Sequence, residues 1–343
     1  MGLLQSARSS AQDLAERRLS LARIAGASTL IDPAFLRSPF VRSTALSSHF
    51  GCEIWLKDET SNPIGCFKGR GAEYFAETAL RRGEKGPWVC ASAGNFGLAL
   101  AHACAHRGIE LRVFVAKDAS AAKVQAIERY GVPIVREGHD FDAAKSAAKA
   151  SARDQGARFV EDGAEPEIAE GAGTIALEIL ARETPHTIIV PLGNGALLAG
   201  IARWTKVHAP DTKVIGVCSA GARVMFDALK GEPPAKLEAA TANTIADGIA
   251  VRVPVPQALE DLEGLVDDVL LVRDEHLIEA MRLMYALEGL IREPSAVAGL
   301  AGIACNRERF RGQRVATIVT GRNLAQAQVK SWLTGTQRLS SNS

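Results

Sequence analysis

Lys68 stands in an unusual place for a lysine. It lies between Phe67 and a glycine in the stretch SNPIGCFKGRGAEYF, residues 61–75. The Asn-Pro and Gly residues of this stretch are typical of a loop, and residues 71–80 have the periodicity of a helix. An amine at a loop-to-helix junction can be partly desolvated and can attack a carbonyl to form a Schiff base. The alternative is a lysine whose stem simply lies along the start of an amphipathic helix.

Three glycine-containing turns directly follow strand-like runs, and each of them could bind an anion. They are SAGNFG at 92–97, GNGA at 193–196 and TGRN at 320–323. In parallel sheets, ligands bind beyond the carboxyl ends of the strands, where helix N-termini offer free N–H groups. The GNGA turn therefore predicts a phosphate cradle. A dinucleotide fingerprint competes, but it requires a third glycine where the chain has Leu198, and a tight turn without a ligand is the remaining alternative.

The other two turns carry polar side chains that complement this cradle. Ser92, the backbone N–H groups and the Asn95 amide suit a carboxylate together with a phenolic oxygen, although a plain helix N-cap would use the same residue types. Thr320 could exchange a hydrogen bond with a ring nitrogen, or serve only as a cap. An amine, a phosphate cradle, a carboxylate-binding loop and this hydroxyl are the parts needed to hold pyridoxal phosphate and an amino acid.

The segments that must position these residues alternate between strands and helices, which predicts an α/β fold with a parallel sheet. Strands are expected at 88–91, 112–116, 133–136, 158–161, 187–191, 213–218 and 314–319, and helices at 98–107, 121–130, 142–154, 173–182 and 197–208. The sequence has no repeat and no low-complexity linker, so we expect interleaved domains. Residues 1–86 and 163–343 would form a large cofactor-binding domain, and 87–162 a smaller, mobile domain that closes over the substrate.

Composition favours a protein that acts on small molecules. The 343 residues carry a net charge of +1 without runs of like charge, which argues against a nucleic-acid or membrane partner. The six cysteines are scattered without a C-x-x-C pair and are expected to be buried thiols. No apolar run approaches the roughly 18 residues of a membrane span, and residues 1–20 lack a signal-peptide core. We therefore expect a cytoplasmic protein. Independently of these features, we expect a homodimer. The first six residues match a loose myristoylation pattern, which an N-terminal amphipathic helix explains equally well.

Six motifs in order make the chain resemble fold-type II pyridoxal-phosphate enzymes, within them the branch of threonine and serine dehydratases (ammonia-lyases) and serine racemase. Residues 63–72 are similar to P-x-G-S-F-K-x-R-G-A, 92–97 to S-x-G-N-H-G, 244–251 to T-x-A-D-G-x-A-V and 293–295 to E-P-S. Residues 193–196 take the place of the glycine-rich phosphate loop, and 320–323 replace S-G-G-N. The resemblance implies a tryptophan synthase β-like fold of two three-layer α/β/α domains with mainly parallel sheets.

The resemblance also implies a role for each matching residue. Lys68 would carry the cofactor aldehyde and later act as the general base, and Thr320 would meet the pyridine nitrogen. The cofactor-binding residues would be Phe67, Lys68, Asn95, Gly193, Asn194, Gly195, Ala196, Leu197, Gly248, Glu293 and Thr320. The substrate-binding residues would be Ser92, Ala93, Gly94, Asn95 and Phe96. Some relatives bind a divalent cation through a glutamate after a Gly-Val pair, but here Cys218 follows that pair, so we predict no metal.

The implied activity is removal of water and ammonia from a β-hydroxy amino acid, which gives a 2-oxo acid. Phe96 replaces the histidine of the motif and makes the site more apolar, so a substrate as large as phenylserine is conceivable. Ala93 replaces the serine of the racemases, which predicts negligible racemisation. The alternatives are β- or γ-replacement, as in cysteine synthase-like or threonine synthase-like enzymes, and a cofactor-binding protein without turnover. The Ala246-Asp-Gly248 and Glu293-Pro-Ser295 segments fit the dehydratases better.

Overall fold

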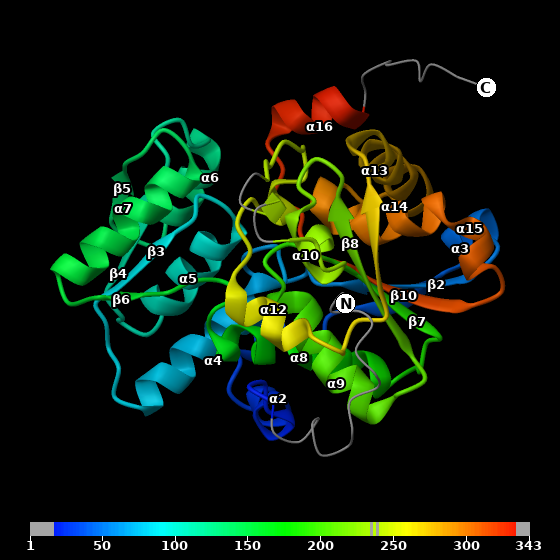
Figure 1. Cartoon of the computed structure of the whole chain (residues 1–343), viewed down its shortest axis with the longest axis horizontal. Helices are drawn as coiled ribbons and strands as arrows, with labels where there is room; N and C mark the ends of the chain where they lie inside the picture. Colours follow the sequence, from blue (N-terminus) through cyan, green and yellow to red (C-terminus); the bar gives the residue numbers. More distant parts are fainter. Residues whose placement is uncertain (1–16, 234–235, 238–239, 334–343) are drawn as a thin grey trace.

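A computed structural model of the chain describes residues 17–233, 236–237 and 240–333. The residues compared with a myristoylation pattern, and most of the segment searched for a signal peptide, lie outside the described residues. Figure 1 shows two bodies of different size, the smaller one built around β3 to β6 and the larger one around the remaining strands. Within the described part of the chain, no helix is both long and apolar enough to cross a membrane.

The larger sheet has six strands in the order β1-β2-β10-β7-β8-β9. All neighbours are parallel except β1, which pairs antiparallel with β2. Their bounds are β1 (Phe40–Ser43), β2 (Glu53–Asp58), β7 (Thr187–Pro191), β8 (Lys213–Ser219), β9 (Asp268–Val272) and β10 (Arg314–Val319). Because parallel strands share one carboxyl edge, the turns that follow β7 and β10 lie at the same side of the sheet.

Alternation along the central strands explains why this sheet is covered on both faces. Ile188 and Val190 of β7 belong to one apolar cluster, which also contains Leu198 of α9 (Ala196–His208). Ile189, between them, belongs to a second cluster with Leu300 of α14 (Ala298–Cys305). Side chains of a strand point alternately to its two faces, so helices on both faces bury the strand completely. This is the three-layer α/β/α arrangement.

The smaller sheet has four parallel strands in the order β5-β4-β3-β6. They are β3 (Trp88–Ala91), β4 (Leu111–Val115), β5 (Ile134–Arg136) and β6 (Arg158–Phe159). Val89 and Ala91 pack with Ala148 of α7 (Phe141–Asp154), whereas Cys90 lies in the main cluster with Leu100 of α5 (Asn95–Ala105). All four strands fall within the range predicted for the smaller domain, and the mobility of that range stays a prediction.

The other helices connect and cover the two sheets. They are α2 (Leu21–Ala27), α3 (Thr44–Phe50), α4 (Lys68–Arg81), α6 (Ala121–Glu128), α8 (Pro166–Leu180), α10 (Val224–Leu229), α12 (Pro256–Leu262), α13 (Asp274–Glu288), α15 (Arg307–Phe310) and α16 (Gln326–Leu333). Short 3-10 turns are η1 (Pro33–Phe35), η2 (Asp247–Ile249) and η3 (Pro294–Val297). Figure 1 shows α4, α8 and α9 beneath the larger sheet in this view, with α4 reaching toward the smaller one.

The structure corrects several sequence-based expectations. All seven predicted strands exist, but the larger sheet also contains β1, β2 and β9, which periodicity did not single out. The strand predicted at 158–161 ends at Phe159, and α8 begins at Pro166 rather than at residue 173. Pro166 occupies the first turn, where its missing N–H costs nothing. Five of the six cysteines are buried as expected, whereas Cys305 is exposed.

Candidate active site

Lys68 is the first residue of α4, and it lines a cavity formed by loops of both sheets. The backbone N–H of Phe67 donates to the carbonyl of Thr320 at 3.0 Å, which ties the start of α4 to the end of β10. The ammonium lies 4.7 Å from the centroid of the Phe67 ring and donates to Oδ2 of Asp162 at 2.5 Å. The Lys68 side chain is only 15% exposed. It is therefore a cavity lysine held at a fixed place, not a surface lysine.

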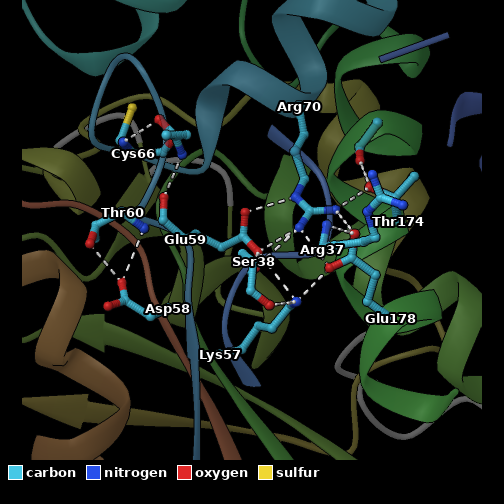
Figure 2. A network of polar contacts seen from close by, with 12 residues as sticks. Arg37, Ser38, Lys57, Asp58, Glu59, Thr60, Cys66, Arg70, Thr174 and Glu178 are labelled. Atoms are coloured by element: carbon cyan, nitrogen blue, oxygen red, sulfur yellow. Dashed lines mark hydrogen bonds and ion pairs between the residues drawn. The ribbon is translucent and has the colours of Figure 1, made fainter. Parts of the chain in front are cut away.

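Arg70, two residues further along α4, anchors this helix through a buried ionic network (Figure 2). Its guanidinium donates to both oxygens of Glu59, at 2.7 and 2.8 Å, and to both oxygens of Glu178, at 2.7 and 2.9 Å. Lys57 adds a second cation, at 2.5 Å from Glu178. Glu59 directly follows β2 and Glu178 belongs to α8. The network therefore fixes the Lys68 helix against the larger sheet.

Charge complementarity explains why four ionised groups tolerate this burial. Burial opposes the ionisation of Glu178, but hydrogen bonds and charge from Arg70, followed by Lys57, lower the pKa of that carboxyl to about 2. Burial likewise disfavours the charged form of Arg70, yet Glu59 and Glu178 outweigh it and raise the pKa of the guanidinium. Two cations thus face two carboxylates, and the network is neutral as a whole.

The turn between β7 and α9 forms one wall of the cavity, from Gly193 to Leu197. Gly195 has φ +104°, a left-handed conformation that side chains other than glycine rarely adopt. A Cβ at Gly193 would lie 3.0 Å from the carbonyl oxygen of Gly248. The first N–H groups of α9 have no carbonyl of their own helix to bind, so they remain available to a ligand. Together these features give a positively polarised cradle at a helix N-terminus.

Asn95 begins α5 and reaches the cavity from the smaller sheet. Its amide nitrogen donates to both oxygens of Glu293, at 3.1 and 3.0 Å, and its amide oxygen accepts from Asn323 at 2.8 Å. Glu293 also accepts from the backbone N–H of Asn323 at 2.7 Å. Burial raises the pKa of the Glu293 carboxyl despite these donors. The network sets the orientation of the Asn95 amide, because both of its ends are engaged.

The structure brings most of the residues singled out from the sequence to this one cavity. The cavity is lined by Phe67, Lys68, Asn95, Gly193, Asn194, Gly195, Ala196, Leu197, Gly248 and Thr320. Glu293 lies behind this wall and acts through Asn95. The hydroxyl of Ser92 accepts from the N–H of Gly94 at 3.2 Å, and Phe96 is buried in the main apolar cluster. Ser92, Ala93, Gly94 and Phe96 do not line the cavity themselves.

Sequence reasoning missed four lining residues: Asp162, Pro191, Ile249 and Ser295. Ile249 and Ser295 lie inside the motif matches 244–251 and 293–295, and Pro191 ends the strand predicted at 187–191, but none of the three was given a role. Asp162 was not singled out at all, although it is the only one of the four that carries a charge. A signal was present, because Glu161-Asp162-Gly163 closes the strand-like run 158–161. The rule applied to the three glycine turns would have pointed to these acidic residues as well.

Comparison with known proteins places the chain among pyridoxal-phosphate proteins. A family model described as pyridoxal-phosphate dependent enzyme matches residues 31–321. The biosynthetic L-threonine dehydratase of Bacillus subtilis is 30% identical over 84% of this chain and 69% of that protein. The chloroplastic biosynthetic threonine dehydratase 1 of Solanum lycopersicum is 31% identical over 87% of this chain. The chain spans only about half, 49%, of that longer protein.

Solved structures agree with the sequence comparison at the level of the fold. A structure of a pyridoxal 5'-phosphate-dependent aspartate racemase superposes with a TM-score of 0.83 at 28% identity. The superposition covers 91% of this chain and 98% of that one. The resemblance therefore extends over both sheets and over the cavity between them.

Proposed function

The chain belongs to the family of pyridoxal-phosphate dependent enzymes, and from this premise we propose that it is an ammonia-lyase that removes water and ammonia from a β-hydroxy amino acid. The product would be a 2-oxo acid. One observation carries the proposal furthest: the amine of Lys68 shares a cavity with the glycine turn 193–195 and with Thr320. The relatives named as threonine dehydratases support the same class of substrate.

The residues that line the cavity fit pyridoxal phosphate. An amine that is 15% exposed suits an aldehyde, and the left-handed Gly195 before α9 leaves room for a phosphate at the helix N-terminus. A side chain at Gly193 would crowd the turn, because its Cβ would lie 3.0 Å from the carbonyl oxygen of Gly248, which also lines the cavity. Thr320 carries an uncharged hydroxyl, which could form a hydrogen bond with the ring nitrogen of the cofactor. Lys68, Asn95, Thr320 and the 193–197 turn would hold the cofactor.

When bound, pyridoxal phosphate supplies an electron sink for the pair left at the substrate Cα. The chain's own residues would do the rest. Lys68 would take the Cα proton on its Nζ atom, since it is the amine in the cavity. Asn95, oriented by Glu293 and Asn323, would hold the phenolic oxygen and the substrate. The N–H groups of the 92–97 loop would bind the substrate carboxylate, and closure of 87–162 would exclude water.

The expected location and assembly belong to the same proposal. We place the enzyme in the cytoplasm, which is supported by six free cysteines, as is usual in a reducing compartment. A homodimer stays a prediction, and sedimentation of the purified protein would test it. Among the described residues, no group of three or more metal-ligating side chains could hold an ion.

A keto-acid release assay tests the function. Purified enzyme with pyridoxal phosphate should release a 2-oxo acid from at least one stereoisomer of serine, threonine, hydroxyaspartate or phenylserine. Lys68→Ala should abolish release and the covalent link to the cofactor that borohydride fixes. Lys85→Ala, which removes an exposed lysine outside the cavity, is the matched control and should leave both intact. Normal turnover by Lys68→Ala would contradict the proposed function.

A further inference from the structure

Asp162 presents a carboxylate to the cavity that the structure satisfies only in part. The residue is 6% exposed and lines the cavity. Its Oδ2 atom accepts from Lys68 at 2.5 Å, and the amide nitrogen of Asn194 lies at 3.5 Å from the same oxygen. Its Oδ1 atom is buried and has no hydrogen-bond partner among the described residues. A buried carboxylate oxygen without a donor is costly, so this atom marks a place where a ligand donor is missing.

The position of Asp162 relates this oxygen to one part of the substrate. Asp162 lies between the Lys68 amine and Asn194 of the glycine turn. In the proposed function, Lys68 reacts with the cofactor and the turn binds phosphate, so neither supplies a lasting partner for Asp162. The substrate carboxylate cannot lie here, because two like charges repel. The α-amino group is consumed in binding to the cofactor. The remaining polar group of the substrate is its β-substituent.

We propose that Asp162 binds the β-substituent of the substrate and selects for groups that donate hydrogen bonds, a β-ammonium most strongly, a β-hydroxyl next, and against a β-carboxylate. This inference rests on the proposed function and names its substrate class more closely. An ionised carboxylate accepts but does not donate, so it matches an ammonium in both charge and hydrogen bonding. It also rejects an anionic side chain, because two like charges repel.

A simpler role for Asp162 predicts a different pattern. If Asp162 only neutralises the Lys68 ammonium, its removal changes the reactivity of Lys68 toward every substrate by the same factor. If it contacts the β-substituent, the factor depends on the charge of that substituent. The ratio of effects between substrates therefore separates the two roles, whereas the activity toward any single substrate does not.

The experiment compares wild-type holoenzyme with Asp162→Asn, which keeps the size of the side chain. 2,3-Diaminopropionate and serine have the same carbon skeleton and both give pyruvate, so one assay yields kcat/KM for the two. Binding of these amino acids and of aspartate is measured separately, from the change in the visible spectrum of the cofactor. Asp211→Asn makes the same substitution at an exposed position away from the cavity and serves as the control.

We expect Asp162→Asn to lower kcat/KM for 2,3-diaminopropionate about 10- to 100-fold more than for serine, the range for a hydrogen bond to a charged group. Binding of aspartate should tighten in the same variant. An equal loss for all three amino acids would overturn the proposal. Asp162→Ser is the second variant. Loss of the cofactor from both variants would also overturn the proposal, since Asp162 would then be needed to bind the cofactor. Absence of pyruvate from wild-type enzyme would instead contradict the lyase function, and the binding ratios would still test Asp162.

Discussion

Replacing Arg70 by methionine should be among the most destabilising single changes in the chain. Arg70 is fully buried and makes six hydrogen bonds, to Glu59, Glu178, Thr174 and Ser38. Methionine keeps the apolar stem but leaves two carboxylates facing Lys57 alone. Removing one partner of a buried ion pair costs about 3–5 kcal/mol. Because a typical domain is stable by only about 5–15 kcal/mol, the urea midpoint of cofactor-free protein should fall strongly.

The size of this loss should depend on pH. In the wild-type protein the pKa of Glu178 is lowered to about 2 from 4.5, so its contribution is complete above pH 4.5 and disappears only as pH falls toward 2. Without Arg70 only Lys57 opposes the burial of Glu178, and burial is the largest single influence on this carboxyl, so we expect its pKa to rise above 4.5. The variant then loses stability as pH rises through that raised pKa. The difference between the two proteins should therefore be larger at pH 7.5 than at pH 5.

An exposed arginine provides the matched control. Arg311 forms an ion pair with Glu308 on the surface, and Arg311→Met should leave the urea midpoint unchanged. The assay is urea unfolding followed by circular dichroism, at both pH values, for wild-type protein and the two variants. A difference between wild type and Arg70→Met that is the same at pH 5 and pH 7.5 would refute the reasoning, because the loss would then come from packing and not from the unpaired carboxylates.

The glycine turn, Ala93 and the smaller sheet can each be tested by one substitution. Gly195→Val should weaken retention of pyridoxal phosphate, measured by absorbance after dialysis, because a branched side chain is strained at φ +104°; unchanged occupancy would exclude this turn as the cradle. Wild type should not racemise a slow substrate in deuterated water, and Ala93→Ser should introduce racemisation; rapid appearance of the other enantiomer with wild type would contradict this. A substrate analogue should slow hydrogen exchange in residues 87–162. Arg252→Met, which removes an ion pair with Asp142, should weaken that effect. Identical exchange with and without the analogue would exclude closure.

The fold was largely predictable because burial on both faces leaves a clear pattern. The run Thr187–Pro191 is buried at every position and apolar after Thr187, since alternate residues enter clusters on opposite faces of the sheet. The strands at or near an edge of the larger sheet were harder to predict. β2 carries Lys57 inside the sequence EIWLKD, and this buried lysine breaks the apolar pattern because it belongs to the ionic network around Arg70. The ionic network that fixes α4 is therefore also the reason why β2 lacks the residue pattern by which a strand is predicted.

The site was predictable only where glycine marked it. Turns at 193–196 and 320–323 could be assigned to one edge, because parallel strands bring their carboxyl ends together. The partners of Asn95 could not, since Glu293 and Asn323 lie about two hundred residues away along the chain and no local pattern relates them. Long-range hydrogen bonds of this kind follow from the packing of the two sheets, which periodicity does not specify.

Asp162 lies in a turn that the glycine rule would have reached, but its burial and its partner could not be predicted from the sequence. β6 is only two residues long, and the side chain of the next residue, Val160, is fully buried. The chain then turns at Gly163, where φ is +91°. This short exit carries Asp162 toward Lys68, 94 positions earlier in the sequence, so the carboxylate meets the amine only when the second sheet is in place. An acidic residue at the end of a weak strand resembles an ordinary solvated turn in the sequence. Asp162 is only 6% exposed, and this burial is the reason to infer a role in substrate specificity, because water would provide the hydrogen bonds of an exposed carboxylate.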